Sequence, residues 1–281
     1  MPAIAAASVA NLRDLGGVPL GAGRSVRDGL VLRSAQLDRL EPDEPAVAAL
    51  KLRTVVDLRT AAERADRPDR LPDGARLLVA DVLADHLAAS GLPPAARLKT
   101  LLTDPALAER HLGGGRIIEA MRGTYRAFVG SPSARASYRA LLVELATPGA
   151  GALLFHCTAG KDRTGWAATV VLTLLGADEA AVREEYLAVN PAVRQAFAPM
   201  IEGFVTQGGD PDLVLAMVGV LPEYLDAGLE EVARRHGSME AYVRDGLGVP
   251  DGTVALLRER LTVHAARGGP EGPGGAGVRP G

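Results

Sequence analysis

The stretch that most constrains this chain of 281 residues runs from Leu153 to Leu175, with the sequence LLFHCTAGKDRTGWAATVVLTLL. A short apolar run comes first, a polar loop follows, and an apolar segment of helical length ends the stretch. The loop holds the only cysteine of the sequence, Cys157, and Arg163 stands six residues later. This order predicts a strand, a tight loop and a buried helix whose N-terminus adjoins the loop.

A loop of this kind favours binding of an oxyanion. The first turn of a helix leaves backbone N–H groups without partners, and the helix dipole adds positive potential. Small residues at Ala159 and Gly160 let successive N–H groups converge on one anion. Arg163 can donate two parallel hydrogen bonds to a phosphate, and the same surroundings favour the thiolate form of Cys157. The loop therefore predicts a cysteine nucleophile that faces a bound phosphate, with the Thr164 hydroxyl available to stabilise the thiolate.

The segment HCTAGKDRTG resembles the signature loop of the cysteine-dependent protein tyrosine phosphatases, H-C-x5-R-[ST], in the form found in bacterial tyrosine and phosphoinositide phosphatases. Further similar stretches are NLRDLGG from Asn11, VDLR at residues 56–59, YLAVN at residues 186–190 and GSMEAY at residues 237–242. The resemblance runs from about Asn11 to Arg260 and implies one phosphatase domain, which we place at residues 11–265. Residues 1–10 are predicted to be a flexible end, as are residues 267–281, which are rich in Gly and Pro and almost without apolar side chains. The resemblance also implies phosphorylated proteins or phosphoinositides as substrates.

The same resemblance suggests which residues bind the substrate. The predicted substrate-binding residues are His156, Thr158, Ala159, Gly160, Lys161, Asp57, Arg59 and Glu63. Lys161 adds a second cation, which favours polyanionic headgroups as well as phosphotyrosine. Asp57 and Arg59 follow a predicted strand, where they either face the site or form an ion pair that ties the next loop.

The general acid is left open by the sequence. Ordinary tyrosine phosphatases carry an acidic residue in a W-P-D sequence, but the single tryptophan here, Trp166, lies in the helix after the loop. Asp81 stands where this branch has an acidic residue facing the pocket, and Asp162 lies inside the loop itself. Glu63 is a third candidate. A carboxyl group beside a phosphate dianion is suited to donate a proton, although Asp162 could equally support the loop amides.

Two alternatives to a phosphatase remain. Another cysteine-loop enzyme, such as an arsenate reductase or a rhodanese, is disfavoured because the reductases use further cysteines and a simple rhodanese loop lacks the Arg163-Thr164 step. A catalytically silent module that binds phosphorylated partners is disfavoured by the intact Cys157 and Arg163.

The remaining pattern predicts an α/β fold: a mainly parallel central sheet of about four strands flanked by helices. Strands are predicted at residues 53–58, 76–82 and before Cys157, with a hairpin around residues 24–34. Helices are predicted at residues 41–52, 117–129, 133–146, 178–189, 221–235, 238–247 and 250–263. Residues 83–122, with short helices around 95–102 and 104–112, form an insertion that could act as a lid.

Composition excludes several other classes. A net charge of −3 argues against nucleic acid as the main partner, and one cysteine excludes an intramolecular disulfide. No histidine or carboxylate spacing indicates a metal site, and no nucleotide-binding motif indicates a cofactor. The N-terminus has no secretory signal pattern and the longest apolar run is too short to span a membrane. We expect a cytoplasmic protein, with export by an unrecognised route and the oligomeric state left open.

Overall fold

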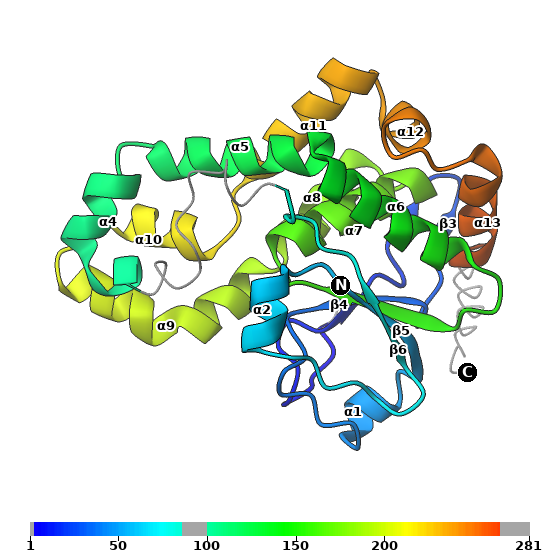
Figure 1. Ribbon diagram of the computed structural model, residues 1–281, viewed down its shortest axis with the longest axis horizontal. Coiled ribbons are helices and arrows are strands. Elements are labelled where there is room, and N and C mark those ends of the chain that lie inside the picture. Colours follow the sequence, from blue (N-terminus) through cyan, green and yellow to red (C-terminus); the bar gives the residue numbers. More distant parts are fainter. Residues whose placement is uncertain (1–2, 86–99, 265–281) are drawn as a thin grey trace, which may run out of the picture.

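The computed structural model describes residues 3–85 and 100–264, and within them the predicted α/β fold is confirmed (Figure 1). Five strands form the central sheet in the order β1-β4-β7-β5-β6. Strands β4, β7, β5 and β6 run parallel, and β1 pairs with β4 in the antiparallel direction. Their bounds are β1 Arg13–Asp14, β4 Val31–Ser34, β7 Ala152–His156, β5 Leu52–Asp57 and β6 Arg76–Val79.

Strands β4 and β7 are buried along their whole length, as expected when helices cover both faces of a parallel sheet. The register aligns His156 at the end of β7 with Ser34 of β4 on one side and Asp57 of β5 on the other. The carboxyl ends of three strands therefore meet directly before Cys157, and this edge is where ligands bind in open α/β sheets.

Helices surround the sheet and extend beyond it (Figure 1). The helix after the loop, α7, is almost entirely buried and forms the centre of the main core. Helices α4, α5, α9 and α10 reach out to one side of the sheet, at the left in Figure 1. The helices are α1 Pro45–Ala48, α2 Ala61–Asp66, α4 Pro105–Leu112, α5 Arg116–Gly130, α6 Pro132–Ala146, α7 Asp162–Leu175, α8 Glu179–Leu187, α9 Asn190–Thr206, α10 Pro211–Val218, α11 Pro222–His236, α12 Met239–Ala241, the π-helical turn η1 Tyr242–Gly246, and α13 Asp251–Leu261.

A second, three-stranded sheet was not predicted. It joins β2 (Pro19–Leu20), β3 (Arg24–Val26) and β8 (Thr262–His264) in antiparallel pairs. The last helix is predicted to end at residue 263, but α13 ends at Leu261 and the following residues adopt strand conformation. Three residues are too few to show a period, so only the pairing with β3 makes this segment a strand.

The ends and the insertion differ in part from the prediction. Residues 3–10 are not a free end: the Ile4 amide donates to the Leu12 carbonyl at 2.9 Å, and Val9 is buried in a core cluster with β4 and β5. In the insertion, the predicted helix at 104–112 is present as α4. The predicted helix at 95–102 lies mostly outside the described residues, of which 100–103 are helical. In the described parts of the chain, no helix is long and apolar enough to cross a membrane.

The contact of α11 with α7 depends on a glycine. A Cβ atom at Gly228 would lie 2.5 Å from Cζ3 of the fully buried Trp166. We expect Gly228→Ala to lower the free energy of unfolding by about 1–3 kcal/mol, because the buried indole cannot move away freely. Denaturant unfolding measures this change.

Gly203 provides the matched control. It also lies inside a helix, α9, but a Cβ atom there meets nothing within 4 Å. Gly203→Ala is expected to raise the free energy of unfolding by about 0.5–1 kcal/mol through helix propensity alone. Equal effects of the two substitutions would contradict the packing argument.

Candidate active site

Cys157 lies at the carboxyl end of the central strand, at the bottom of a loop that leads into α7. Strand β7 ends at His156, residues 158–161 form the loop, and α7 begins at Asp162. The side chain of Cys157 is buried, with only 2% of the residue exposed. The predicted strand–loop–helix arrangement is therefore confirmed.

The carbonyl groups of loop residues 158–160 are held by other parts of the chain. The backbone amide of Gln36 donates to the residue 158 carbonyl at 3.1 Å. The Asn11 side-chain amide donates to the carbonyls of residues 159 and 160 at 3.3 and 3.0 Å. Arg33 donates to the residue 160 carbonyl at 2.6 Å. Because a peptide unit points its N–H away from its C=O, these contacts turn the loop N–H groups towards the interior of the loop.

The N–H groups that result are available to a ligand. Within the described residues, the backbone amides of residues 158–163 donate no hydrogen bond. These donors belong mostly to half-buried residues and lie at the N-terminus of a buried helix, where the dipole adds positive potential. The arrangement is suited to a tetrahedral oxyanion.

Gly160 allows the loop to approach β4. Its φ is +67°, a conformation that disfavours residues with a side chain, and a Cβ atom there would collide with the backbone of Ser34. The predicted role of Gly160 in curling the loop thus has a second cause, the close contact with the neighbouring strand.

Arg33 is itself fixed by a buried carboxylate. Its guanidinium donates to both oxygens of Glu185 on α8, at 2.9 and 2.7 Å, and Arg13 pairs with the same carboxylate at 3.2 Å. All three side chains are almost completely buried. Sequence reasoning did not assign a role to Asn11, Arg33 or Glu185, because each contacts residues that lie far away in the sequence.

Arg163 is oriented by Glu63. The two terminal guanidinium nitrogens lie 2.7 Å from the two carboxylate oxygens of Glu63, which belongs to the first turn of α2. The Thr158 hydroxyl also donates to this carboxylate. Although burial acts in the opposite direction, Arg163 holds the pKa of Glu63 well below its usual range. Glu63 is therefore ionised, which argues against it as the proton donor.

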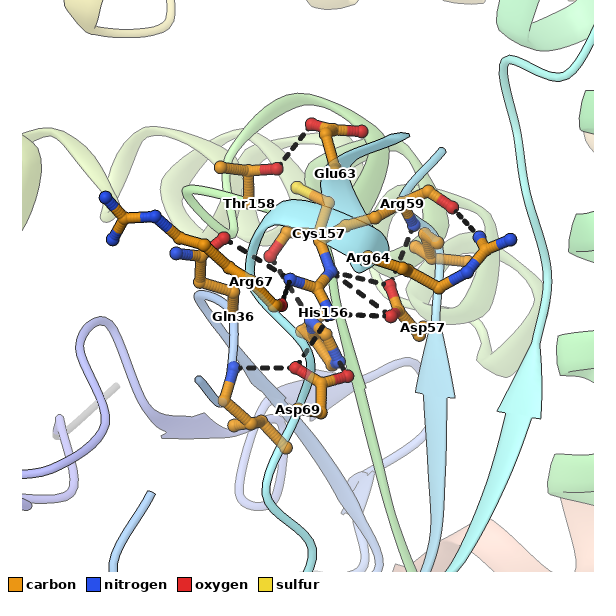
Figure 2. A network of polar contacts seen from close by, with 12 residues as sticks. Gln36, Asp57, Arg59, Glu63, Arg64, Arg67, Asp69, His156, Cys157 and Thr158 are labelled. Carbon is orange, nitrogen blue, oxygen red and sulfur yellow. Dashed lines mark hydrogen bonds and ion pairs between the residues drawn. The ribbon is translucent and has the colours of Figure 1, made fainter. Parts of the chain in front are cut away.

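A second network lies on the other side of Cys157 (Figure 2). The Arg59 guanidinium contacts the carboxylates of Asp57 at 2.8 Å and Asp69 at 2.9 Å. Asp69 in turn lies 3.0 Å from Nε2 of His156, whose Nδ1 faces the Cys157 carbonyl at 3.2 Å. Asp57 and Arg59 thus form an ion pair, which is one of the two roles that the sequence predicts for them. The role of Asp69 was not predicted from the sequence.

This network does not fit a metal ion. In the described residues, the only group of three close metal-ligating side chains is Asp57, Asp69 and His156. The Arg59 guanidinium lies between the two carboxylates and already supplies their positive partner. The three groups therefore belong to a hydrogen-bonded support for the end of β7.

The two candidate proton donors have different surroundings. The Asp81 carboxylate accepts hydrogen bonds from the backbone amides of Ala61 and Leu83, each at 3.1 Å, so it caps α2 and its own turn. Asp162, in the first turn of α7, accepts a hydrogen bond from the Tyr125 hydroxyl at 3.2 Å. Asp162 directly follows the loop, and Asp81 makes no hydrogen bond or ion pair with the loop within the described residues.

The side chains of Lys161 and Thr164 have different surroundings. The Lys161 ammonium donates to the carbonyls of residues 217, 218 and 219 at the end of α10, at 3.2, 3.0 and 3.0 Å. It also lies 3.6 Å from Asp162. The buried Thr164 hydroxyl has no hydrogen-bond partner among the described residues. Its predicted action on the Cys157 thiolate, and contact of Lys161 with substrate, stay predictions.

Comparison of the sequence with known proteins identifies the family of this chain. A family model described as "Tyrosine phosphatase family" matches residues 4–263. The chain belongs to the tyrosine phosphatase family. It is 34% identical over 256 residues to the triple specificity protein phosphatase PtpB of Mycobacterium tuberculosis, across 83% of this chain and 91% of that protein. It is 32% identical over 263 residues to a putative tyrosine-protein phosphatase of Cupriavidus necator, across 89% of this chain and 85% of the relative.

Membership of this tyrosine phosphatase family confirms the predicted resemblance and supports a phosphatase over an arsenate reductase or a rhodanese. The match begins at residue 4 and includes β8. It therefore covers both the loop and the elements that hold the loop carbonyls.

The pair between Glu63 and Arg163 predicts a pH-dependent contribution to stability. We expect Glu63→Gln to lower the free energy of unfolding by about 1–3 kcal/mol at neutral pH, since it removes two charge-assisted hydrogen bonds. Because the folded pKa of Glu63 is depressed, this contribution is present above the unfolded pKa of about 4.3 and is lost as the pH falls towards the folded pKa. Denaturant unfolding of both proteins between pH 7 and pH 3 measures it.

The matched control is Glu41→Gln. Glu41 forms an exposed pair with Arg70 at 3.0 Å, and exposed pairs contribute little. A stability difference between Glu63→Gln and the parent protein that stayed constant down to pH 3 would contradict the assignment.

Proposed function

We propose that this tyrosine phosphatase family member hydrolyses phosphomonoesters through a cysteinyl-phosphate intermediate on Cys157. The observation that carries the proposal is the loop directly after the buried cysteine: the carbonyls of residues 158–160 are bound from outside, and the backbone N–H groups of residues 158–163 donate no hydrogen bond within the described residues. Arg163 completes this anion site from the first turn of α7. Preorganised donors of this kind stabilise the charge that develops on phosphate oxygens during transfer.

The proposed reaction has two displacement steps. In the first, the Cys157 thiolate attacks phosphorus, the bond from phosphorus to the leaving oxygen breaks, and a carboxyl group gives its proton to that oxygen. In the second, water attacks the phosphocysteine, the same carboxylate takes a proton from the water, and the sulfur leaves as thiolate. Arg163 and the loop amides hold the three non-bridging oxygens throughout, and Thr164 donates its free hydroxyl to the thiolate.

We assign the proton transfer to Asp162. It is the first residue of α7, directly after the loop, whereas the Asp81 carboxylate accepts hydrogen bonds from the backbone amides of Ala61 and Leu83, outside that loop. Glu63 is excluded as the donor by its pair with Arg163. The assignment places donor and nucleophile within one short segment of chain.

The proposed substrates are phosphotyrosine proteins, with extension to phosphoserine and phosphothreonine proteins and to phosphoinositides. The family supports phosphotyrosine, and the extension is supported by the relative that is named a triple specificity phosphatase. Lys161 supports phosphoinositides if its ammonium turns from the carbonyls of α10 to a second phosphate.

Phosphate release from a matched panel tests the function. The panel holds phosphotyrosine, phosphoserine and phosphothreonine peptides together with mono- and polyphosphorylated inositol lipids. We expect turnover, fastest on phosphotyrosine, that falls by at least about 10⁴-fold in Cys157→Ser. Folded protein that binds phosphotyrosine peptide without releasing phosphate would instead indicate a silent phosphate-binding module.

The contribution of Lys161 is tested on the same panel. We expect Lys161→Met to lower kcat/KM for a polyphosphorylated inositol lipid by about tenfold more than for a phosphotyrosine peptide, because only the lipid offers a second phosphate to the ammonium. An equal loss on both substrates would indicate that Lys161 acts by holding α10 to the loop.

A further inference from the structure

Two buried tyrosines connect Asp162 to the helices that cover the loop. The Tyr125 hydroxyl on α5 donates to Oδ1 of Asp162 at 3.2 Å. The hydroxyls of Tyr125 and of Tyr186, which lies on α8, are 2.8 Å apart. The Tyr186 hydroxyl also reaches the Leu221 carbonyl at 3.5 Å. A continuous chain of hydrogen bonds therefore leads from Asp162 into the interior of the protein.

This chain of hydrogen bonds fixes the positions of both tyrosine hydroxyls, because they have few other partners. Tyr125 and Tyr186 are fully buried, and their rings meet edge to face with centroids 6.2 Å apart. Burial, reinforced by the nearby charge of Asp162, raises the pKa of both phenols well above the usual value. Both phenols therefore stay neutral at any pH at which the enzyme would work, and each can donate one hydrogen bond and accept another.

Tyr125 can donate to Oδ1 of Asp162 in either protonation state of the carboxyl group. When Asp162 is ionised, Tyr186 donates to Tyr125, and Tyr125 donates to the carboxylate. When Asp162 is protonated, Oδ2 carries the proton that passes to the leaving group, and Oδ1 is a carbonyl oxygen that still accepts from Tyr125. Each hydroxyl keeps a partner in both states, so the carboxyl group can change its protonation without leaving a buried donor unpaired.

We propose that Tyr125 and Tyr186 are positioning residues that hold the Asp162 carboxyl group in one orientation while it gives its proton to the leaving group and later takes one from water. This inference rests on the proposed function, in which Asp162 carries that proton. Among the described residues, the other charged or titratable groups near Asp162 are Lys161, Arg163, Tyr138 and Tyr224. Lys161 lies at the opposite carboxylate oxygen, Oδ2, so the two oxygens have different partners.

Substrates that differ in their leaving group separate positioning of the acid from general damage. The phenolate of tyrosine needs a proton as it leaves, since its pKa is about 10, whereas p-nitrophenolate is stable without one. We expect Tyr125→Phe to lower kcat/KM for a phosphotyrosine peptide by about tenfold and for p-nitrophenyl phosphate by less than about threefold. Tyr186→Phe should show the same preference with a smaller loss, because Tyr125 remains in contact with Asp162.

Tyr224→Phe is the matched control. Tyr224 is buried beside Tyr125, with ring centroids 6.1 Å apart, but its hydroxyl donates to the Ala216 carbonyl at 3.0 Å. This variant should leave the ratio of the two kcat/KM values unchanged. Loss on both substrates to the same degree in Tyr125→Phe would overturn the proposal and indicate a structural role.

A double-mutant cycle with Asp162→Asn provides the second test. Asp162→Asn should lower kcat/KM for the phosphotyrosine peptide by about a hundredfold, and adding Tyr125→Phe should cost nothing further, since the tyrosine acts only through the carboxyl group. Additive losses, or an Asp162→Asn protein with full activity, would overturn the proposal. Activity that persists in Cys157→Ser would instead overturn the proposed cysteine mechanism, so the two failures are distinguishable.

Discussion

The site depends on hydrogen bonds that bind the carbonyl groups of the catalytic loop from outside. A short loop has no regular secondary structure that would orient its peptide units. Each of its backbone C=O groups therefore needs a hydrogen-bond partner from elsewhere in the chain. Asn11, Gln36 and Arg33 provide those partners from the N-terminal part of the chain. With the carbonyls held in this way, the N–H groups are oriented before any ligand arrives, so little reorganisation is needed in the proposed binding of a phosphate.

Electrostatics explains why so many ionised groups are buried near one cysteine. Arg33 would be costly to bury alone, and Glu185 on α8 offsets that cost at 2.7 Å. Arg59 and His156 share Asp69 in the same way beneath the end of β7. These pairs leave Arg163 as the cation at the open side of the loop, where Glu63 orients it and a phosphate can contact it.

The local pattern of apolar and polar residues correctly predicted those helices and strands whose structure is determined by nearby residues. The run from Leu153 to Leu175 shows strand, loop and helix through its own order of apolar and small residues, and the long amphipathic helices show through their period. Asp69, Asn11 and Glu185 could not be found in this way, because each acts on an atom more than eighty residues away in the sequence. Strand β8 was missed for the same reason, since its structure comes from a partner near the other end of the chain.

That pairing also orders events during synthesis. Strand β3 forms a ladder with β8, which pairs Arg24 with His264, so the small sheet remains incomplete until residue 264 has left the ribosome. The central sheet has a similar delay, because β4 and β5 lie on either side of β7 and meet only through it. An unfinished chain therefore exposes β4 and β5 as unpaired apolar edges, and nascent forms of this enzyme should depend on chaperones that shield such edges until β7 is inserted.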